Sequence, residues 1–462
     1  MHTITNRYNR FLMIAGMLVL AGAFSSCKKY LEVDAPIDKL TSDKVFASPI
    51  NALAAVNGLY TFALKERTFM TYQGDFLLGM AADEFVYGST QYDDFTNNTL
   101  QATNSDVGAT WKLFYQVIYQ ANGIIEKIQG SPVSDSLKAV YTAEAKVFRA
   151  FCHLYLTSYF GDVPLIQTTD VTVTATVPRI AKADVLAAVV NDLIDAEASL
   201  PNGTVRNGRF NKWMATALLA RVYLYLGNWA AAEAKASALI NNTSGFTLLT
   251  DLTKVFLRGS KEAIWQINSA DNNYTYWASF NVPTATTTSI ASLSRVRPEL
   301  YNAYEAGDKR KTTWMGSTTI SGTFFYYDYK YKQLSAPTSS SAIEDFMLLR
   351  LAEQYLIRAE ARAQQENQNG AIDDLNAIRN RAGITPLVYG LAKADVLLAV
   401  EKERKLELFG EGYGHRWIDL NRTNRANAVL GAEKPSTWKP TASLWPIPQN
   451  EINNNPALTP NP

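Results

Sequence analysis

The segment ALLARVYLYLGNWAAAEAKASALI (residues 217–240) is the clearest indication of the fold class of this chain. Apolar residues recur at helical spacing on both sides of its single glycine. The pattern therefore predicts one helix over Asn211–Leu226 and another over Trp229–Ile240. Gly227 and Asn228 supply the turn between them. Small Ala residues stand where two antiparallel helices would touch closely, so we expect the two helices to pack as a pair.

A second copy of this pattern follows in LLRLAEQYLIRAEARAQQENQNGAIDDLNAIRNRAG (residues 348–383). It predicts helices over Leu349–Gln365 and Ala371–Arg381, with a turn at Asn369 and Gly370. Both copies resemble tetratricopeptide units, but more than 100 residues separate them, unlike the units of a continuous solenoid. The predicted fold class is mainly α, a tetratricopeptide-like scaffold of helical pairs with large loop and short-strand insertions. Further helices are expected at Pro49–Lys65, Trp111–Gln129 and Leu137–Phe160.

Three stretches depart from this helical pattern. The stretch Thr68–Ser105 is rich in Gly, Asn, Asp and Tyr, so we expect long loops there. In Asn241–Ala342, β-branched and aromatic residues alternate with Ser, Thr, Gly and Asn clusters, which favours short strands or ordered loops. The tail from Pro435 cannot be one continuous helix because proline recurs in it. We expect its apolar part, around Trp445, to pack onto the body.

The first 27 residues, MHTITNRYNRFLMIAGMLVLAGAFSSC, have the order of a secretory signal peptide. Two Arg residues precede the apolar run Phe11–Phe24, whose 14 residues fall short of the roughly 20 that span a bilayer. Small residues then lead into Cys27, as at a bacterial lipoprotein cleavage site where the thiol is acylated, for example with palmitate. An ordinary secretory signal is the alternative. The only other thiol, Cys152, falls on a predicted helix with an apolar face and is expected to be buried.

Charge and motifs exclude several classes of function. The chain has 44 basic and 43 acidic residues, and losing residues 1–26 with their two Arg leaves a formal charge of −1. This balance gives no basis for a nucleic-acid partner. No GxSxG, Walker or dinucleotide motif occurs. Apart from the neighbours Cys152 and His153, neither His153 nor His415 has a second His or Cys at ligand spacing, so we expect no metal and no cofactor.

Acidic pairs leave a glycosidase as a weaker alternative. A glycosidase needs two carboxylates about 5 to 9 Å apart across the sugar, and sequence neighbours do not establish that distance. Glu401, Glu403 and Glu407 alternate with basic residues on one predicted helix, which favours a solvated or ion-paired face. We therefore predict no catalytic residue and no enzyme. The other acidic pairs are Asp83 with Glu84 and Asp93 with Asp94.

Aromatic residues give the clearest indication of a ligand. The chain has 24 Tyr, 20 Phe and 9 Trp, and many of them fall in polar, loop-like segments. Large rings with a polar tip suit a partly wet site, where a sugar face packs on the ring and amides bind its hydroxyls. Each ring could instead pack its loop onto the scaffold, and Trp111, Trp213 and Trp265 on regular elements are expected in the core. The candidate ligand-binding residues are Tyr72, Tyr87, Tyr92, Asn98, Tyr274, Tyr276, Trp277 and Trp314.

Four segments, in order along the chain, resemble the RagB/SusD family. They are AEAKVFRAFCHLYLTSYFGDVPLI (143–166), the helix pair at 348–383, ERKLELFGEGYGHRWIDLNRT (403–423) and LWPIPQNEINNNPAL (444–458). The third departs from the family's more usual FEGHRW by the extra Gly410, Tyr413 and Gly414. The roles expected in these motifs are structural: Arg404 pairs with Glu407, Trp417 and Asp419 fix the following turn, and Trp445 locks the tail.

The resemblance implies a surface lipoprotein of the outer membrane, lipid-anchored and facing outward, that captures an oligosaccharide or other oligomer. Its partner would be a SusC-like TonB-dependent transporter, with the helical side facing the transporter and the inserted loops binding the ligand. The alternative is a helical scaffold that binds this partner, with peptide or other non-glycan cargo or with no small ligand. The expected regions are a signal peptide (1–26), a SusD-like N-terminal helical region with aromatic loops (27–240), and a C-terminal region with inserted loops, a helix pair and a Pro-rich tail (241–462).

Overall fold

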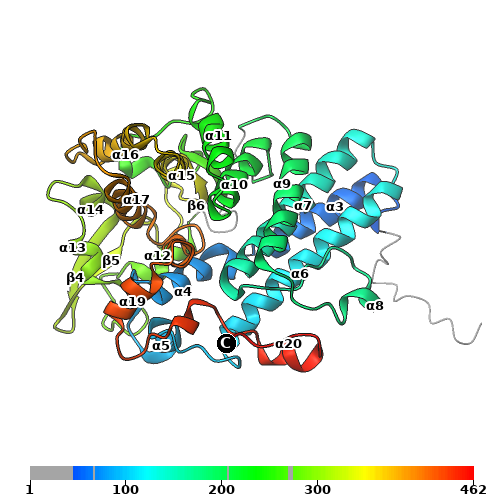
Figure 1. Ribbon diagram of the computed structural model, residues 1–462, viewed down its shortest axis with the longest axis horizontal. Helices are drawn as coiled ribbons and strands as arrows, with labels where there is room; N and C mark the ends of the chain where they lie inside the picture. Colours follow the sequence, from blue (N-terminus) through cyan, green and yellow to red (C-terminus); the bar gives the residue numbers. More distant parts are fainter. Residues whose placement is uncertain (1–44, 66–67, 205–207, 269–273) are drawn as a thin grey trace, which may run out of the picture.

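The computed structural model describes residues 45–65, 68–204, 208–268 and 274–462. The predicted signal peptide and Cys27 lie outside these residues. Helices dominate the described chain, which confirms the predicted fold class, and Figure 1 shows them crossing the molecule from α3 and α6 to α16 and α17. The principal helices are α3 (Pro49–Ala63), α6 (Ser105–Lys127), α7 (Asp135–Phe160), α9 (Lys182–Ser199), α10 (Lys212–Tyr225), α11 (Trp229–Ile240), α15 (Leu351–Gln364), α16 (Gln368–Ala382), α17 (Lys393–Leu408), α18 (His415–Arg422) and α19 (Ala426–Glu433).

The two predicted helix pairs both form, and they pack directly on each other. The turn predicted at Asn369 and Gly370 is wrong, because α16 already begins at Gln368 and the chain turns just before it, with Asn367 as the N-cap. The side chain of Asn211 caps α10 by accepting from the amides of Trp213 and Met214, and that of Asn228 caps α11. Gly227 between them adopts the left-handed φ of 69° that closes the turn. Helix α11 contacts α15, so α10, α11, α15 and α16 form one continuous row of helices. The insertion between the two pairs lies outside this row.

The insertion contains the expected short strands, together with short helices. Three of these strands join β1, from earlier in the chain, in a four-stranded antiparallel sheet of order β1-β3-β5-β4. The fourth, β2, pairs with β6, which follows the insertion. The strands are β1 (Phe85–Tyr87), β2 (Ala263–Ile267), β3 (Ser294–Val296), β4 (Met315–Ile320), β5 (Thr323–Asp328) and β6 (Phe346–Arg350). The shorter α-helices are α4 (Gly74–Ala81), α5 (Asp93–Thr96), α8 (Val171–Thr174), α12 (Tyr276–Asn281), α13 (Pro298–Asn302), α14 (Lys309–Trp314) and α20 (Gln449–Asn454). The single turns are the π-helix η2 (Phe69–Gln73) and the 3₁₀ helices η3 (Thr90–Tyr92), η4 (Ile128–Gly130), η5 (Leu252–Lys254), η6 (Ser340–Ala342) and η7 (Pro440–Ser443).

The prediction of long loops over Thr68–Ser105 is wrong. This stretch forms η2, α4, β1, η3 and α5, and every residue of α4 is buried. Its glycines are there for close packing. A Cβ on Gly74 would lie 2.7 Å from the Tyr413 ring, and one on Gly79 would lie 2.4 Å from the Phe85 ring. The glycines that made this segment look like a loop are therefore positions where an aromatic ring packs directly against the backbone of α4.

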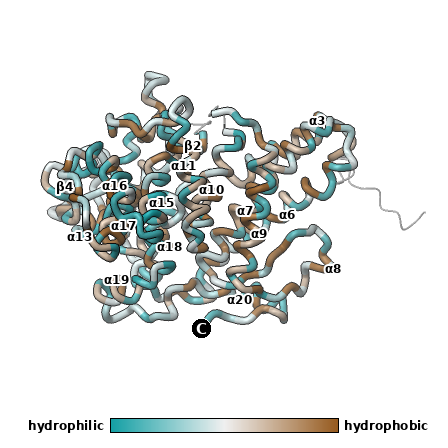
Figure 2. Tube along the Cα trace, turned by 45° about the horizontal axis from the view of Figure 1, so that its top comes forward, coloured by the Kyte–Doolittle hydropathy of each residue, from teal (hydrophilic) through white to brown (hydrophobic). Residues whose placement is uncertain are grey.

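One hydrophobic core runs through most of the described chain, and the tail belongs to it. Trp445 is buried, as predicted, against the rings of Phe95 and Tyr159, and its amide donates to the Tyr159 carbonyl at 2.8 Å. Cys152 is buried and free, also as predicted. The tube in Figure 2 shows apolar stretches along α7, α9 and α10, whereas the region of α15 to α18 is more hydrophilic.

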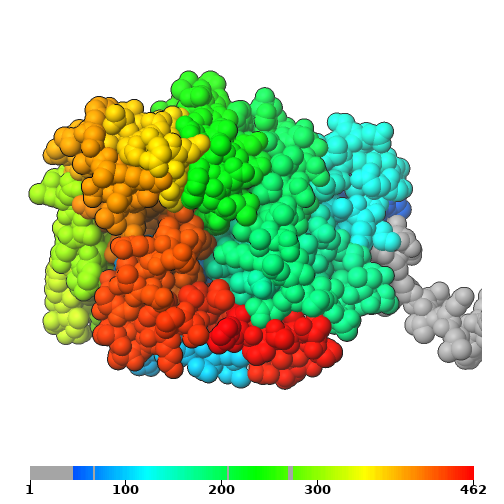
Figure 3. All heavy atoms as spheres, viewed as in Figure 1, coloured from blue at the N-terminus to red at the C-terminus, as the bar shows by residue number. Residues whose placement is uncertain are grey.

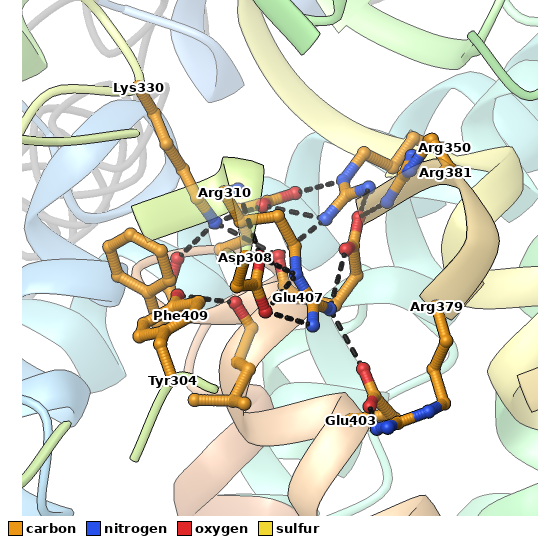
Figure 4. A network of polar contacts seen from close by, with 12 residues as sticks. Tyr304, Asp308, Arg310, Lys330, Arg350, Arg379, Arg381, Glu403, Glu407 and Phe409 are labelled. Carbon is orange, nitrogen blue, oxygen red and sulfur yellow. Dashed lines mark hydrogen bonds and ion pairs between the residues drawn. The ribbon is translucent and has the colours of Figure 1, made fainter. Parts of the chain in front are cut away.

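Charged side chains fill the interior of that hydrophilic region. Glu407 on α17 is fully buried and is ion-paired with Arg310 from α14 (3.2 Å), Arg350 from β6 (2.5 Å) and Arg381 from α16 (Figure 4). Burial alone would raise the pKa of Glu407, but the three guanidinium groups hold it well below its usual range. The predicted pair between Arg404 and Glu407 is therefore wrong. Helix α17 aims Glu407 at three other elements.

Candidate functional site

Four of the predicted ligand residues meet in one surface cluster. Tyr72 lies on η2, Tyr87 on β1, Tyr92 on η3 and Tyr276 on α12, so the cluster joins elements far apart in the chain. All four rings are partly exposed. We call these residues, with Phe76 and Phe280, the aromatic cluster.

Phe76 and Phe280 hold the four tyrosines together. Tyr72 stacks on Phe280 with ring centroids 4.9 Å apart and meets Tyr276 edge-on at 5.2 Å. The buried Phe76 contacts Tyr87 at 5.5 Å, Tyr92 at 5.1 Å and Phe280 at 5.6 Å. Tyr87 and Tyr92 meet at 5.0 Å. Such mutual ring contacts fix each ring's orientation before any ligand arrives.

Phe76 and Phe280 were missed in the sequence. Their signal is the helical spacing of four residues, from Tyr72 to Phe76 and from Tyr276 to Phe280, which puts each pair on one helix face. In a segment predicted to be a loop, as the one around Tyr72 is, a spacing of four residues does not indicate a shared face.

Polar groups border the rings. The Gln73 side chain donates to the Asp106 carboxylate at 2.9 Å, and Gln91 donates to the Tyr92 hydroxyl at 3.1 Å. Burial, with Asp106 and Tyr87 nearby, raises the pKa of Tyr92, and burial raises that of Asp106. The phenol therefore stays a donor at neutral pH. Rings, amides and a carboxylate together provide stacking faces beside hydrogen-bonding groups.

Three predicted ligand residues lie in the core instead. Trp277 and Trp314 are each only 1% exposed. Their indole groups donate to the Asp328 carboxylate at 2.9 Å and to the Leu252 carbonyl at 3.1 Å. Tyr276 and Trp277 are neighbours on α12 but lie on different faces of the helix, and the face of Trp277 packs on the core. Neither indole ring presents a face to a ligand, which corrects the prediction for both.

Asn98 is the third of these residues. It is 7% exposed and has a left-handed φ of 55°. Its amide donates to the Ala81 carbonyl at 2.9 Å and accepts from Lys434 at 2.7 Å, so its polar atoms serve the fold. Tyr274, just before α12, is partly exposed and stays a candidate.

The acidic pairs are mostly engaged in the fold. Asp83 is ion-paired with Arg416 and Lys405, and Glu401 with Arg416 and Arg425. Burial and then the charge of Asp83 raise the pKa of Glu84 to about 8. Within the described ranges, no group of three or more His, Cys, Asp or Glu is placed to hold a metal ion. No helix in those ranges is long and apolar enough to cross a membrane.

Comparison with known families covers both halves of the chain. A profile described as "SusD family" matches residues 260–462, and one described as "Starch-binding associating with outer membrane" matches residues 29–224. SusD-like protein P38 of Formosa agariphila is 27% identical, over 96% of this chain and 97% of that protein.

Solved structures agree with this match. A SusD superfamily protein from Bacteroides vulgatus superposes with a TM-score of 0.78 at 21% identity, over 89% of this chain and 98% of its own. A structure described as a laminarin-binding SusD-like protein gives a TM-score of 0.74 at 26% identity, over 90% of this chain and all of its own. Matched in sequence along both halves and in fold along nearly its whole length, the chain belongs to the SusD/RagB family.

Proposed function

We propose that this protein is an outer-membrane lipoprotein, anchored through Cys27 and facing outward, that binds an oligosaccharide at the aromatic cluster. It delivers that ligand to a SusC-like TonB-dependent transporter and does not cleave it. The observation that carries the ligand proposal is the cluster itself. Tyr72, Tyr87 and Tyr92 come from one segment of the chain and meet Tyr276 from a distant one. Contacts with buried or stacked rings hold all four, and each stays partly exposed.

The chemistry of the cluster fits a glycan. Sugar rings present C–H faces that pack on tyrosine and phenylalanine, while hydroxyls pair with groups such as Gln73, Gln91 and Asp106. A relative described as laminarin-binding makes a β-glucan a reasonable first probe. A lipid anchor would hold the captured ligand beside the transporter and raise its local concentration without any new contact.

Isothermal titration calorimetry with laminarin and a panel of other soluble glycans, on the chain from Lys28 onward, tests the proposal. For a glycan that binds, Tyr72→Ala and Tyr276→Ala should each weaken binding at least 10-fold, about 1.4 kcal/mol, because each removes one stacking face. Tyr119→Ala is the matched control. This exposed tyrosine lies on α6 thirteen residues from Asp106, about 20 Å along the helix axis.

Binding that is equal in all three variants would show that the glycan binds elsewhere. If no glycan in the panel binds while short peptides do, the cargo is not a sugar and the ligand class proposed is wrong. Release of shorter sugars from a bound glycan would contradict the non-enzymatic role.

A further inference from the structure

A pocket of about 700 Å³ opens on the helical side of the molecule, apart from the aromatic cluster. Its walls come from the α10–α11 turn and from α15, α17 and α18, and Figure 3 shows the surface hollowed where these green, yellow and orange segments meet. The volume is in the usual range for a small-molecule site. We call it the α10–α18 pocket.

Arg404 contributes a buried charge to this pocket. Its side chain is 2% exposed, and its Nε donates to the Asp419 carboxylate at 2.6 Å. Within the described part of the chain, Nη1 and Nη2 have no hydrogen-bond partner, although both atoms are buried. Buried guanidinium donors are normally paired, so two open donors beside a cavity indicate a site for an acceptor.

Tyr225 adds a third donor. It lines the same pocket, and its buried hydroxyl has no hydrogen-bond partner among the residues that the structure describes. Arg404 and Asp419 are among the charged groups that act on this phenol. The open donors therefore belong to one corner of the pocket.

The acids around that corner are already occupied. Arg422 pairs with Glu360 at 2.6 Å and with Asp419 at 2.8 Å, while Arg425 pairs with Glu401 at 3.0 Å. Asp419 is shared between Arg404 and Arg422, one oxygen to each. What the corner lacks is an acceptor with two oxygens, matched to the fork of Arg404.

Another part of the wall is apolar. Leu226, Trp229, Leu397 and Leu398 line the pocket, and Leu226 and Leu398 are 40% and 51% exposed. Exposed leucines beside a cavity favour an apolar body on the ligand, since covering them removes that surface from water.

We propose that the α10–α18 pocket binds a carboxylate attached to an apolar group, with the carboxylate on Arg404 and Tyr225 and the apolar group against Leu397, Leu398 and Trp229. Such a group occurs as a free organic acid or as the C-terminus of a polypeptide. The proposal is independent of glycan binding, which uses other residues.

Calorimetry on the chain from Lys28 onward tests this with two matched pairs of probes. The first is 3-phenylpropanoate against its neutral amide, which represents the free acid. The second is N-acetyl-Leu-Leu with a free C-terminus against its C-terminal amide, which represents the polypeptide end. We expect at least one acid to bind at least 10-fold more tightly than its amide, and the tighter acid identifies the source.

Variants locate the site. Tyr225→Phe keeps the ring and should weaken the binding acid about 10-fold, because one donor is lost. Leu398→Asp, an exposed position, should abolish binding by placing a charge on the apolar wall. Leu137→Asp, a similarly exposed leucine on α7, is the control and should bind like the unmodified protein.

Circular dichroism checks that each variant is folded, and two variants with different positions keep the test open if one fails to fold. The proposal is overturned if neither acid binds at millimolar concentration, since water alone then satisfies Arg404 and Tyr225. Equal binding of acid and amide also overturns it, as does acid binding that Leu398→Asp leaves unchanged. Laminarin titrations of Leu398→Asp should be unaffected, which separates this site from the aromatic cluster.

Discussion

At the scale of single residues, burial decides the role of similar side chains. Tyr276 and Trp277 are adjacent, yet one ring is partly exposed in the aromatic cluster and the other is sealed against Asp328. Glu366 and Glu407 are both ion-paired, but the first is exposed beside one lysine and the second is buried among three arginines. Charged neighbours therefore matter far more for Glu407.

Glu407→Gln should lower the free energy of unfolding by about 3–5 kcal/mol. The substitution keeps the shape but leaves Arg310, Arg350 and Arg381 with an uncompensated buried charge. Urea unfolding followed by circular dichroism measures the change. Glu366→Gln removes an exposed pair with Lys393 and should have little effect. A small loss for Glu407→Gln would show that the remaining carboxylates of the network compensate.

At the scale of elements, close packing shapes the segment that carries the aromatic cluster. Helix α4 lies fully buried between ring systems, and β1 follows it directly, so the position of Tyr87 depends on how α4 meets Phe85. The helix pairs behave differently. The residues that cap and turn each pair are neighbours in the sequence, so the formation of a pair depends mainly on local residues.

Gly79→Ala should therefore destabilise the protein by about 1–3 kcal/mol, because the new methyl group would press into the Phe85 ring. It should also weaken glycan binding by displacing Tyr87. Gly58→Ala on α3 is the matched control, since the new methyl group meets nothing within 4 Å and should stabilise by about 0.5–1 kcal/mol. Thermal unfolding of both variants gives the two opposite signs. Equal shifts would contradict the packing argument.

At the scale of the whole molecule, buried carboxyl groups contact residues hundreds of positions away in the chain. Glu84, just before β1, is buried and accepts from the amide of Gly410 in the α17–α18 turn at 3.4 Å. Burial, and then the charge of Asp83, raises its pKa to about 8. The ionised form is thus disfavoured in the folded state, so its contribution to stability depends on pH.

The sign of this dependence follows from proton uptake. The raised pKa means that the folded chain holds a proton on Glu84 where the unfolded chain has lost it, between about pH 4.5 and 8. Its stabilising contribution is complete below that window and is lost as pH rises through it. Urea unfolding at pH 5, 6, 7 and 8 should show the stability of the unmodified protein, relative to Glu84→Gln, falling as pH rises. Parallel curves for the two proteins would contradict the raised pKa.

The helices, their pairing, the buried tail and the presence of aromatic residues in polar segments could all be predicted from the sequence. These features depend on local spacing, caps and composition, as at Asn211, Gly227 and Asn228. The sequence also predicted four residues of the aromatic cluster, because tyrosines in polar segments are seldom all buried. They are Tyr72, Tyr87, Tyr92 and Tyr276. Fold and candidate site were to that extent predictable.

Which rings face outward and which charged groups pair depends on the three-dimensional packing of the chain. Trp277 is buried where β5 places Asp328 within hydrogen-bonding distance of its indole. Glu407 pairs with three arginines from distant elements and not with Arg404, its neighbour in the sequence. The α10–α18 pocket likewise needs helices from both pairs side by side. Such contacts depend on residues far apart in the chain, whose approach is set by packing and not by any local pattern.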